Sequence, residues 1–319
     1  MTSGLQKFLE KIIDYAGLFP PSELPMDEAI QNYARYREDV DNWMLSRFIC
    51  PASRLHELDA YSEMFRQDEP YRFSIIGKPS EDLHEFKRNL EETLLEISRF
   101  RQRHGPGVDT GMLELHFPKD HAVHAGVLQL TGQMVDELSS EETMVFFEEQ
   151  QGDGWLGKIN KAIPVIAAYN NDKPSLKLQR AGYKLRSGGT KAEMFPSVEE
   201  VAQVIKLCCS VNIPFKATAG LHHPVRYFDE TYQVWAHGFF NVFLAGILTC
   251  SHRLPDIIIL SILEDDDPDS FFFNEDYIGW RDIRISISQL QTIRRENVIS
   301  LGSCSFDEPR EDLMGLKLF

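Results

Sequence analysis

The chain has 319 residues, with 33 Lys and Arg against 49 Asp and Glu, which gives a formal net charge of −16 at pH 7. This acidic surplus argues against nucleic acid as a partner, because a phosphate backbone attracts basic surfaces. Hydrophobic residues make up 43% of the sequence and aromatic residues 11%. That proportion supports a large buried core and excludes the disordered and fibrous classes.

The sequence offers no sign of export or membrane insertion. The most apolar run, residues 239–250, is about twelve residues long and short of the roughly twenty that span a bilayer. Five cysteines, at positions 50, 208, 209, 250 and 304, form no CxxC pair. The odd count argues against a disulfide framework or a zinc ribbon. We therefore expect a soluble cytoplasmic protein with no membrane partner, in which Cys208 and Cys209 serve only as packing residues.

Short strand-like runs alternate with helix-like runs along the whole chain, which predicts a parallel sheet. The predicted strands are residues 43–51, 72–78, 111–117, 143–148, 182–188, 213–220 and 298–306. Residues 163–169 and 270–273 are the two candidates for an eighth strand. No GxGxxG follows the first predicted strand and no GxxxxGK[ST] occurs, which disfavours an open nucleotide-binding sheet. We predict a (β/α)8 TIM barrel.

The barrel is expected to form one domain over residues 1–319, because no linker or internal repeat interrupts the chain. Residues 1–42 are predicted to be an N-terminal helical extension that breaks at the prolines 20 and 21. Residues 221–297 are too long for a simple connection and are expected to contain extra helices before the last strand. Ser197 and Glu200, three residues apart, predict a helix capping box. The turn-rich segment 14–21 suggests no chemistry.

Charged residues are predicted to point into the barrel. Because side chains alternate faces along a strand, Glu114 and His116 share one face, as do Lys184 and Arg186 on a second strand and Lys216 and Thr218 on a third. Leaving a buried charge without its partner costs about 3–5 kcal/mol, so these groups need partners or a use. An inert ion network, with Glu114 and Glu148 neutralising the cations, is one explanation. Their position at strand ends, where TIM barrels carry active sites, favours a functional site.

Two lysine strands carry a family resemblance. The segment AGYKLRSG at 181–188, followed by FKATAGL at 215–221, resembles the paired-lysine strands of the deoxyribose-phosphate aldolase family. The segment LGSCS at 301–305 resembles that family's phosphate-binding turn. The resemblance implies a class I aldolase barrel in which Lys184 forms a Schiff base and Lys216 lowers its pKa. Leu185 and Arg186 depart from the family's small hydroxyl residues, and its catalytic aspartate has no assigned counterpart here.

Glycine turns follow the same strands and are predicted to bind an anion, because turns expose backbone N–H groups. The expected substrate-binding residues are Arg186, Gly188, Gly189, Thr218, Gly220, Gly302 and Ser303. The expected catalytic residues are Lys184, Lys216, Glu114 and His116. Together they favour an enzyme: an aldolase-like lyase that needs no cofactor and acts on a small anionic carbonyl compound.

Two alternatives remain at this point. In the first, Glu114, His116, Glu148 and the histidines 222 and 223 bind Mn, Zn or Fe, and the barrel is a divalent-metal-dependent isomerase or lyase. In the second, the barrel binds a ligand without catalysis, because a fold does not determine a function. Whether the chain forms a homo-oligomer is left open.

Overall fold

The computed structural model of the chain describes residues 2–120, 123–152 and 154–317. Eight parallel strands form a closed barrel in the order β1-β13-β7-β6-β5-β4-β3-β2, with helices between most of them, so the predicted TIM barrel is confirmed. The barrel strands are β1 (Ile13–Tyr15), β2 (Leu45–Pro51), β3 (Tyr71–Ile76), β4 (Val108–His116), β5 (Thr143–Glu148), β6 (Leu178–Arg186), β7 (Phe215–Thr218) and β13 (Val298–Ser303).

Seven of these strands lie where the sequence predicts them, but both candidates for the eighth are wrong. Residues 163–169 lie inside helix α5 (Trp155–Asp172), where the buried positions recur at helical rather than alternating spacing. Residues 271–273 form β10 (Phe271–Phe273), a strand of a separate antiparallel sheet. The eighth barrel strand is β1, within the predicted N-terminal extension. With three residues, all buried, β1 is too short to show an alternating pattern.

The contacts within the chain divide it into two compact units. Unit 1 comprises the described residues within 1–23, 39–46 and 185–319, and unit 2 those within 24–38 and 47–184. Each unit is described below by itself.

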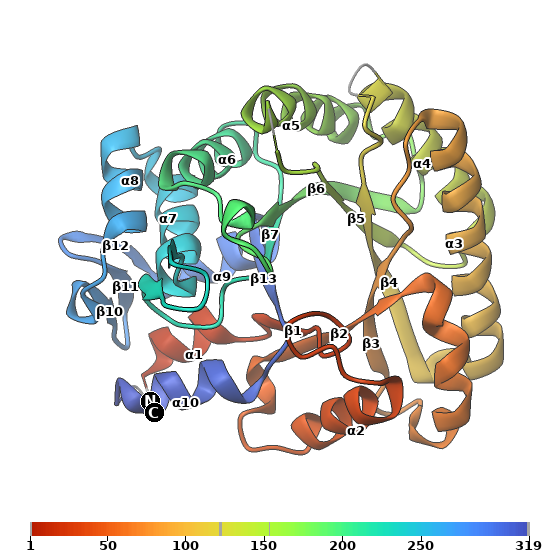
Figure 1. Ribbon diagram of the computed structural model, residues 1–319, viewed down its shortest axis with the longest axis horizontal. Helices are drawn as coiled ribbons and strands as arrows, with labels where there is room; N and C mark the ends of the chain where they lie inside the picture. Colours follow the sequence, from red (N-terminus) through yellow and green to blue (C-terminus); the bar gives the residue numbers. More distant parts are fainter. Residues whose placement is uncertain (1, 121–122, 153, 318–319) are drawn as a thin grey trace. The chain divides into compact units, whose positions relative to one another are not determined.

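Unit 2 contains most of β2, all of β3, β4 and β5, and β6 as far as residue 184, each strand parallel to the next. Its helices are α2 (Met26–Arg37), η2 (Ala52–Met64), α3 (Leu83–His104), α4 (His124–Leu138) and α5. The side chain of Asp82 caps α3 by accepting the N–H of Glu85, and Gly105 with φ 56° ends it. Helices α3 and α4 lie side by side (Figure 1).

Unit 1 contains β1, β13 and β7, with β13 between the other two, and a set of helices. These helices are α1 (Ser3–Leu9), α6 (Val198–Ser210), α7 (Phe239–His252), α8 (Asp256–Glu264), α9 (Ile287–Glu296) and α10 (Asp307–Gly315). The predicted capping box is present at the start of α6. The most apolar run of the sequence forms α7, whose first eleven residues are all buried.

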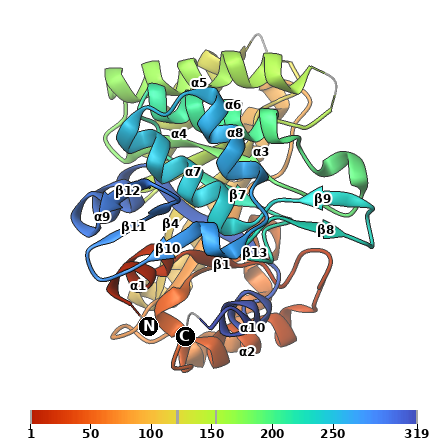
Figure 2. The ribbon, with the colours of Figure 1, turned by 90° about the vertical axis from the view of Figure 1, so that its left-hand side faces the viewer.

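The enlarged region 221–297 contains the expected helices α7, α8 and α9, and also two small sheets that the sequence analysis does not predict. One is the hairpin of β8 (Tyr227–Asp229) and β9 (Val234–Ala236), which projects from unit 1 in Figure 2. The other joins β10, β11 (Tyr277–Trp280) and β12 (Ile283–Ser286). The N-terminal extension contains the predicted helices, α1 and α2, in addition to β1.

The prediction that the cysteines form no disulfide is wrong for one pair. Cys209 on α6 and Cys250 on α7 are joined by a disulfide across a sequence separation of 41 residues. Cys208 is a buried free thiol, as predicted. The error arises because α6 and α7 pack against each other, and cysteine spacing along the chain does not report helix packing.

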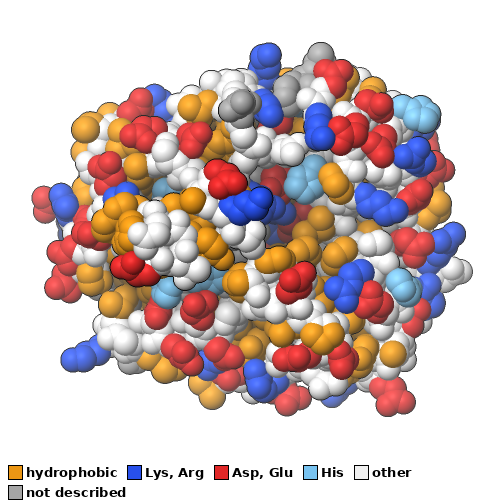
Figure 3. All heavy atoms as spheres, in the orientation of Figure 1, with side chains coloured by type: hydrophobic (Ala, Val, Ile, Leu, Met, Phe, Trp, Pro, Cys, Tyr) orange, Lys and Arg blue, Asp and Glu red, His pale blue; other side chains and the backbone are white. Residues whose placement is uncertain are grey.

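Among the described residues no helix combines the length and the apolar character needed to cross a bilayer. Acidic and basic side chains are interspersed over the face of the molecule shown in Figure 3.

Candidate active site

Lys184 lies in a buried cluster of ionisable side chains within unit 2. Its Nζ is 2.8 Å from Oε2 of Glu114 and 2.9 Å from Oε2 of Glu148. At most 4% of each of these three side chains is exposed. One ammonium between two carboxylates leaves one negative charge when all three are ionised. The prediction that Glu114 faces the same interior space as Lys184 is confirmed.

Strand register explains why these residues meet. Glu114 and His116 are two positions apart on β4 and therefore project from the same face. On β5, Glu148 is directly opposite His116, and Phe147 is opposite Tyr183 of β6, which brings Glu148 level with Lys184. The cluster is therefore built into three neighbouring parallel strands at their carboxyl ends.

Two further side chains extend this cluster. The hydroxyl of Ser74, on β3, donates a hydrogen bond of 2.5 Å to Oε1 of Glu114 and is fully buried. Nε2 of His116 lies 3.9 Å from Oε2 of Glu148, and 26% of the His116 side chain is exposed. His116 thus lies at the solvent-facing edge of the cluster and Ser74 at its closed edge.

Lys216 has its own buried partner in unit 1. Its Nζ is 2.7 Å from Oδ2 of Asp14 on β1, and both side chains are 0% exposed. The hydroxyl of Ser300 donates a second hydrogen bond to the same oxygen at 2.6 Å. The segment 14–21, to which the sequence analysis assigns no chemistry, therefore supplies the counter-ion of Lys216.

A second cation approaches Asp14 from α9. Burial lowers the pKa of the Arg294 guanidinium to about 10, and the negative charges of Asp14 and Glu10 oppose that change. The Arg294 guanidinium donates hydrogen bonds to the backbone carbonyls of Phe8, Glu10, Val298 and Ile299. Arg294 therefore ties the start of β13 to the segment that precedes β1.

Several predicted substrate-binding residues meet in unit 1. A Cβ placed on Gly188 would lie 2.8 Å from Cα of Gly220, so the two turns approach too closely for any side chain. Gly220 also has φ +70°, which favours glycine. Thr218 is in register with Gly302 of β13. The N–H of Ser187 donates to the carbonyl of Thr218 at 2.8 Å, which joins the turns after β6 and β7.

The remaining predicted binding residues are less well placed to bind an anion. Gly189 packs against the side chain of Met194. The hydroxyl of Ser303 donates to the carbonyl of Ser305 at 2.7 Å and is thus engaged within its own turn. Arg186 ends β6 and is partly buried. Ser187, absent from the predicted set, is fully buried, and its hydroxyl has no hydrogen-bond partner in the part of the chain that the structure describes.

The two histidines of the metal hypothesis pair with carboxylates of α10. His222 Nδ1 is 2.9 Å from Oε2 of Glu308, and this hydrogen bond lowers the pKa of the Glu308 carboxyl below its ordinary value. His223 hydrogen-bonds Asp312 through Nδ1. Within residues 2–120, 123–152 and 154–317, no group of three or more His, Cys, Asp or Glu side chains is arranged to hold a metal ion. In unit 2 the Lys184 ammonium already lies against both carboxylates of the hypothesis.

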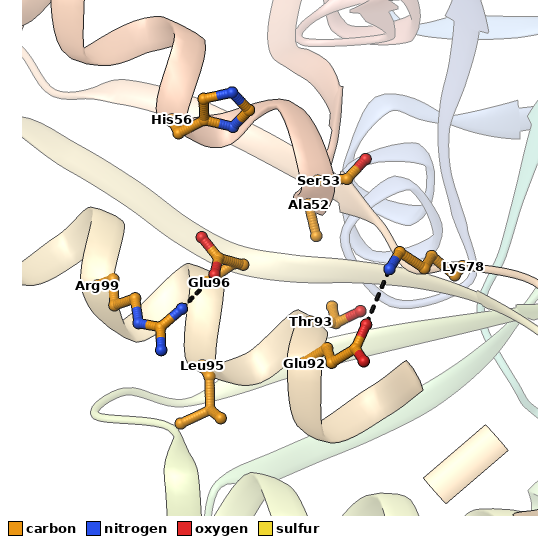
Figure 4. Close-up of a pocket in the computed structure, with 9 residues that line it drawn as sticks. All are labelled: Ala52, Ser53, His56, Lys78, Glu92, Thr93, Leu95, Glu96 and Arg99. Carbon is orange, nitrogen blue, oxygen red and sulfur yellow. Dashed lines mark hydrogen bonds and ion pairs between the residues drawn. The ribbon is translucent and has the colours of Figure 1, made fainter. Parts of the chain in front are cut away.

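A separate groove of about 500 Å³ lies in unit 2 between η2 and α3 (Figure 4). Lys78 pairs with Glu92 at 2.8 Å across it, and Arg99 pairs with Glu96. None of the predicted site residues lines this groove.

Sequence patterns identify neither Asp14 nor Ser74 as a site residue and give Ser187 no role. Asp14 lies in a three-residue strand, and Ser74 is a small polar residue in an otherwise apolar strand. The one signal in the sequence is that a buried lysine needs a carboxylate partner. That rule does not identify which Asp or Glu is the partner.

Comparisons of the sequence and the structure with known proteins found no match. No family model matches the chain, and no curated protein or solved structure is significantly similar to it.

Proposed function

We propose that the protein is a class I aldolase-like lyase that forms a Schiff base between Lys184 and a small anionic carbonyl compound. The observation that carries the proposal is the buried Lys184 ammonium, held at 2.8 and 2.9 Å from two carboxylates at the carboxyl ends of barrel strands. TIM-barrel enzymes carry their catalytic groups at this end of the strands. The resemblance of residues 181–188 and 215–221 to paired-lysine aldolase strands supports the same role.

The two carboxylates supply the proton transfers that this chemistry needs. A lysine amine attacks a carbonyl carbon only after the ammonium has lost a proton, and a carboxylate of the cluster accepts it. A C–N bond then forms, the oxygen takes up a proton, and loss of water gives the iminium. Cleavage of the carbon–carbon bond sends its electron pair into the iminium while a carboxylate takes the hydroxyl proton. No cofactor takes part in this scheme.

Lys216 is proposed as the second cation, with a smaller influence than the resemblance implies. Asp14 lies 2.7 Å from its Nζ and offsets its positive charge. A neutralised cation lowers the pKa of a second lysine less than a bare one does. In this proposal Lys184 becomes a neutral amine mainly by passing its proton to one of the two carboxylates beside it, with only a small contribution from Lys216.

The anionic group of the substrate is proposed to bind the turns that contain Gly188 and Gly220. Turns of this kind present backbone N–H groups to an anion, and the Ser187 hydroxyl, which has no hydrogen-bond partner among the described residues, is the side-chain donor in this proposal. Phosphate titration followed by amide NMR tests this part. Saturable shifts at Ser187, Gly188 and Gly220 that weaken in Ser187→Ala support it, and their absence contradicts it.

Borohydride trapping tests the Schiff base directly. Incubation of the full chain with a panel of small phosphorylated and carboxylated aldehydes and ketones, followed by reduction, is expected to leave one adduct on Lys184, located by peptide mass spectrometry. Lys184→Met should lose the adduct, while Lys206→Met, a change of an exposed lysine on α6, should keep it. A panel that yields no adduct, or an adduct that survives in Lys184→Met, would overturn the proposal and leave the metal-dependent enzyme and the non-catalytic binding barrel.

A further inference from the structure

The two carboxylates that contact Lys184 have different surroundings. Oε1 of Glu114 accepts the Ser74 hydroxyl at 2.5 Å, and both side chains are at most 1% exposed. Glu148 is within 3.9 Å of His116, which has 26% of its side chain exposed. Glu114 therefore connects Lys184 to a buried hydroxyl. Glu148 instead lies between Lys184 and a histidine that is partly exposed to solvent.

We propose that Glu148 and His116 form the path along which protons pass between the Lys184 ammonium and solvent, and that Ser74 keeps Glu114 as a fixed carboxylate. The use of this path rests on the proposed function, because a Schiff-base lysine must lose its proton before it attacks a carbonyl. The existence of the path depends only on the geometry of the cluster.

Access to solvent distinguishes the two carboxylates. Oε2 of Glu148 is 2.9 Å from the Lys184 ammonium and 3.9 Å from the partly exposed His116 imidazole, so a proton taken by Glu148 lies next to an exposed group. Oε1 of Glu114 instead accepts a hydrogen bond from the fully buried Ser74 hydroxyl. The register of β4 and β5 places His116 directly opposite Glu148.

His116 suits the second step of the path. An imidazole with an ordinary pKa of about 6.5 takes up and releases a proton at neutral pH. The 3.9 Å separation exceeds hydrogen-bond length, so a small rotation of the ring or one bridging water completes the transfer. One proton moves from Nζ to the Glu148 carboxylate, then to the imidazole, then to water, and the reverse sequence returns it.

A neighbouring histidine does not offer the same route. His124 on α4 pairs with Glu149 at 2.7 Å, and at most 3% of either side chain is exposed. This pair follows Glu148 in the chain but has no exposed end through which a proton could leave. It therefore fixes the end of β5 rather than conducting protons.

Exchange of the Lys184 ammonium hydrogens with water measures the path without requiring catalysis. The full chain is labelled with ¹⁵N-lysine, and the Lys184 signal is assigned by its loss in Lys184→Arg. His116→Gln is expected to slow the exchange by about a hundredfold, the lower end of the effects of a positioned acid or base, and free imidazole should restore part of the rate. Ser74→Ala and His84→Gln, a change of an exposed histidine on α3, should not slow it.

Each outcome decides the proposal. If the wild-type signal is broadened beyond detection by fast exchange, it should emerge in His116→Gln, and a signal absent from both proteins contradicts the path. Equal rates in wild type and His116→Gln, or an equal slowing in Ser74→Ala, also contradict it. Should His116→Gln fail to fold, Glu148→Gln together with imidazole acceleration in the wild type gives the same decision. If borohydride trapping yields no adduct but the exchange rates are as expected, the aldolase function is contradicted while the proton path is supported.

Discussion

Two lysines on neighbouring barrel strands have different surroundings. Lys216 meets Asp14 in a pair that is 0% exposed and that Ser300 completes with a further hydrogen bond. Lys184 meets two glutamates, one of which lies beside a partly exposed histidine. Lys216 ion-pairs with Asp14, whereas Lys184 can pass a proton to one glutamate while the other stays ionised, so the net charge of its cluster stays at −1. The same residue type at similar strand positions thus suits stability in one case and reactivity in the other.

The largest expected effect comes from breaking the Lys216 pair. Asp14→Asn leaves a buried ammonium without its carboxylate, which should cost about 3–5 kcal/mol in the free energy of unfolding. Urea denaturation measures this loss. The double variant Asp14→Asn with Lys216→Met should recover most of it, because the buried ammonium is removed together with its carboxylate. A loss below about 1 kcal/mol in the single variant would show that Lys216 does not depend on Asp14.

A smaller loss is expected at Lys184. Glu148→Gln removes one carboxylate, but Glu114 remains 2.8 Å from the ammonium. We expect a cost of about 1–2 kcal/mol in the same denaturation experiment, in the range for one buried hydrogen-bond partner lost. If Glu148→Gln lowered the free energy of unfolding as much as Asp14→Asn does, Lys184 would depend on one carboxylate as strongly as Lys216 does, which contradicts the comparison.

Chemical labelling sharpens the contrast without changing the sequence. An amine-acylating reagent at pH 8 should modify Lys184 before Lys216, because the Lys184 cluster borders the partly exposed His116, whereas Lys216 and Asp14 are both 0% exposed and need a larger opening of the structure. Peptide mass spectrometry over time gives both rates, and we expect a ratio of at least about tenfold, since opening of a core strand is rare. Labelling of Lys216 first would contradict the comparison.

The smallest effect is expected at a partly exposed pair, His222 with Glu308. The hydrogen bond from His222 lowers the pKa of Glu308 in the folded protein, so its stabilisation is complete above the unfolded value of about 4.3 and is lost as pH falls through the lower folded value. The Glu308 side chain is 44% exposed, and solvent screening limits the effect to about 0.5 kcal/mol. Glu308→Gln should therefore match wild type in urea stability at low pH and fall slightly below it at pH 6.

The sequence predicts the parts of this molecule that local patterns determine. Alternation along β4 places Glu114 and His116 on one face, and the structure confirms that both approach Glu148 or Lys184. Alternation cannot identify β1, because three residues contain no repeat. The bond between Asp14 and Lys216 joins residues 202 positions apart, and no local pattern encodes such a pairing.

The disulfide and the helical structure of residues 163–169 also depend on information that a short stretch of sequence does not contain. Cys209 and Cys250 meet because two helices pack, which depends on tertiary structure rather than on cysteine spacing. In 163–169 an apolar run suits a buried strand or a buried helix equally well until its neighbours are included. Extending the window to the whole of α5 reveals the helical spacing of its buried residues.

The pairing of β13 with both β1 and β7 has a consequence for synthesis on the ribosome. Ile13–Tyr15 is translated long before Val298–Ser303, the strand beside it. The whole of unit 2 has been translated once residue 184 leaves the exit tunnel, and domains of growing chains fold as their segments emerge. Until residue 303 follows, a nascent chain lacks the strand that lies between β1 and β7, and the first strand of the barrel lacks one of its two neighbours long after the other, β2, has been translated.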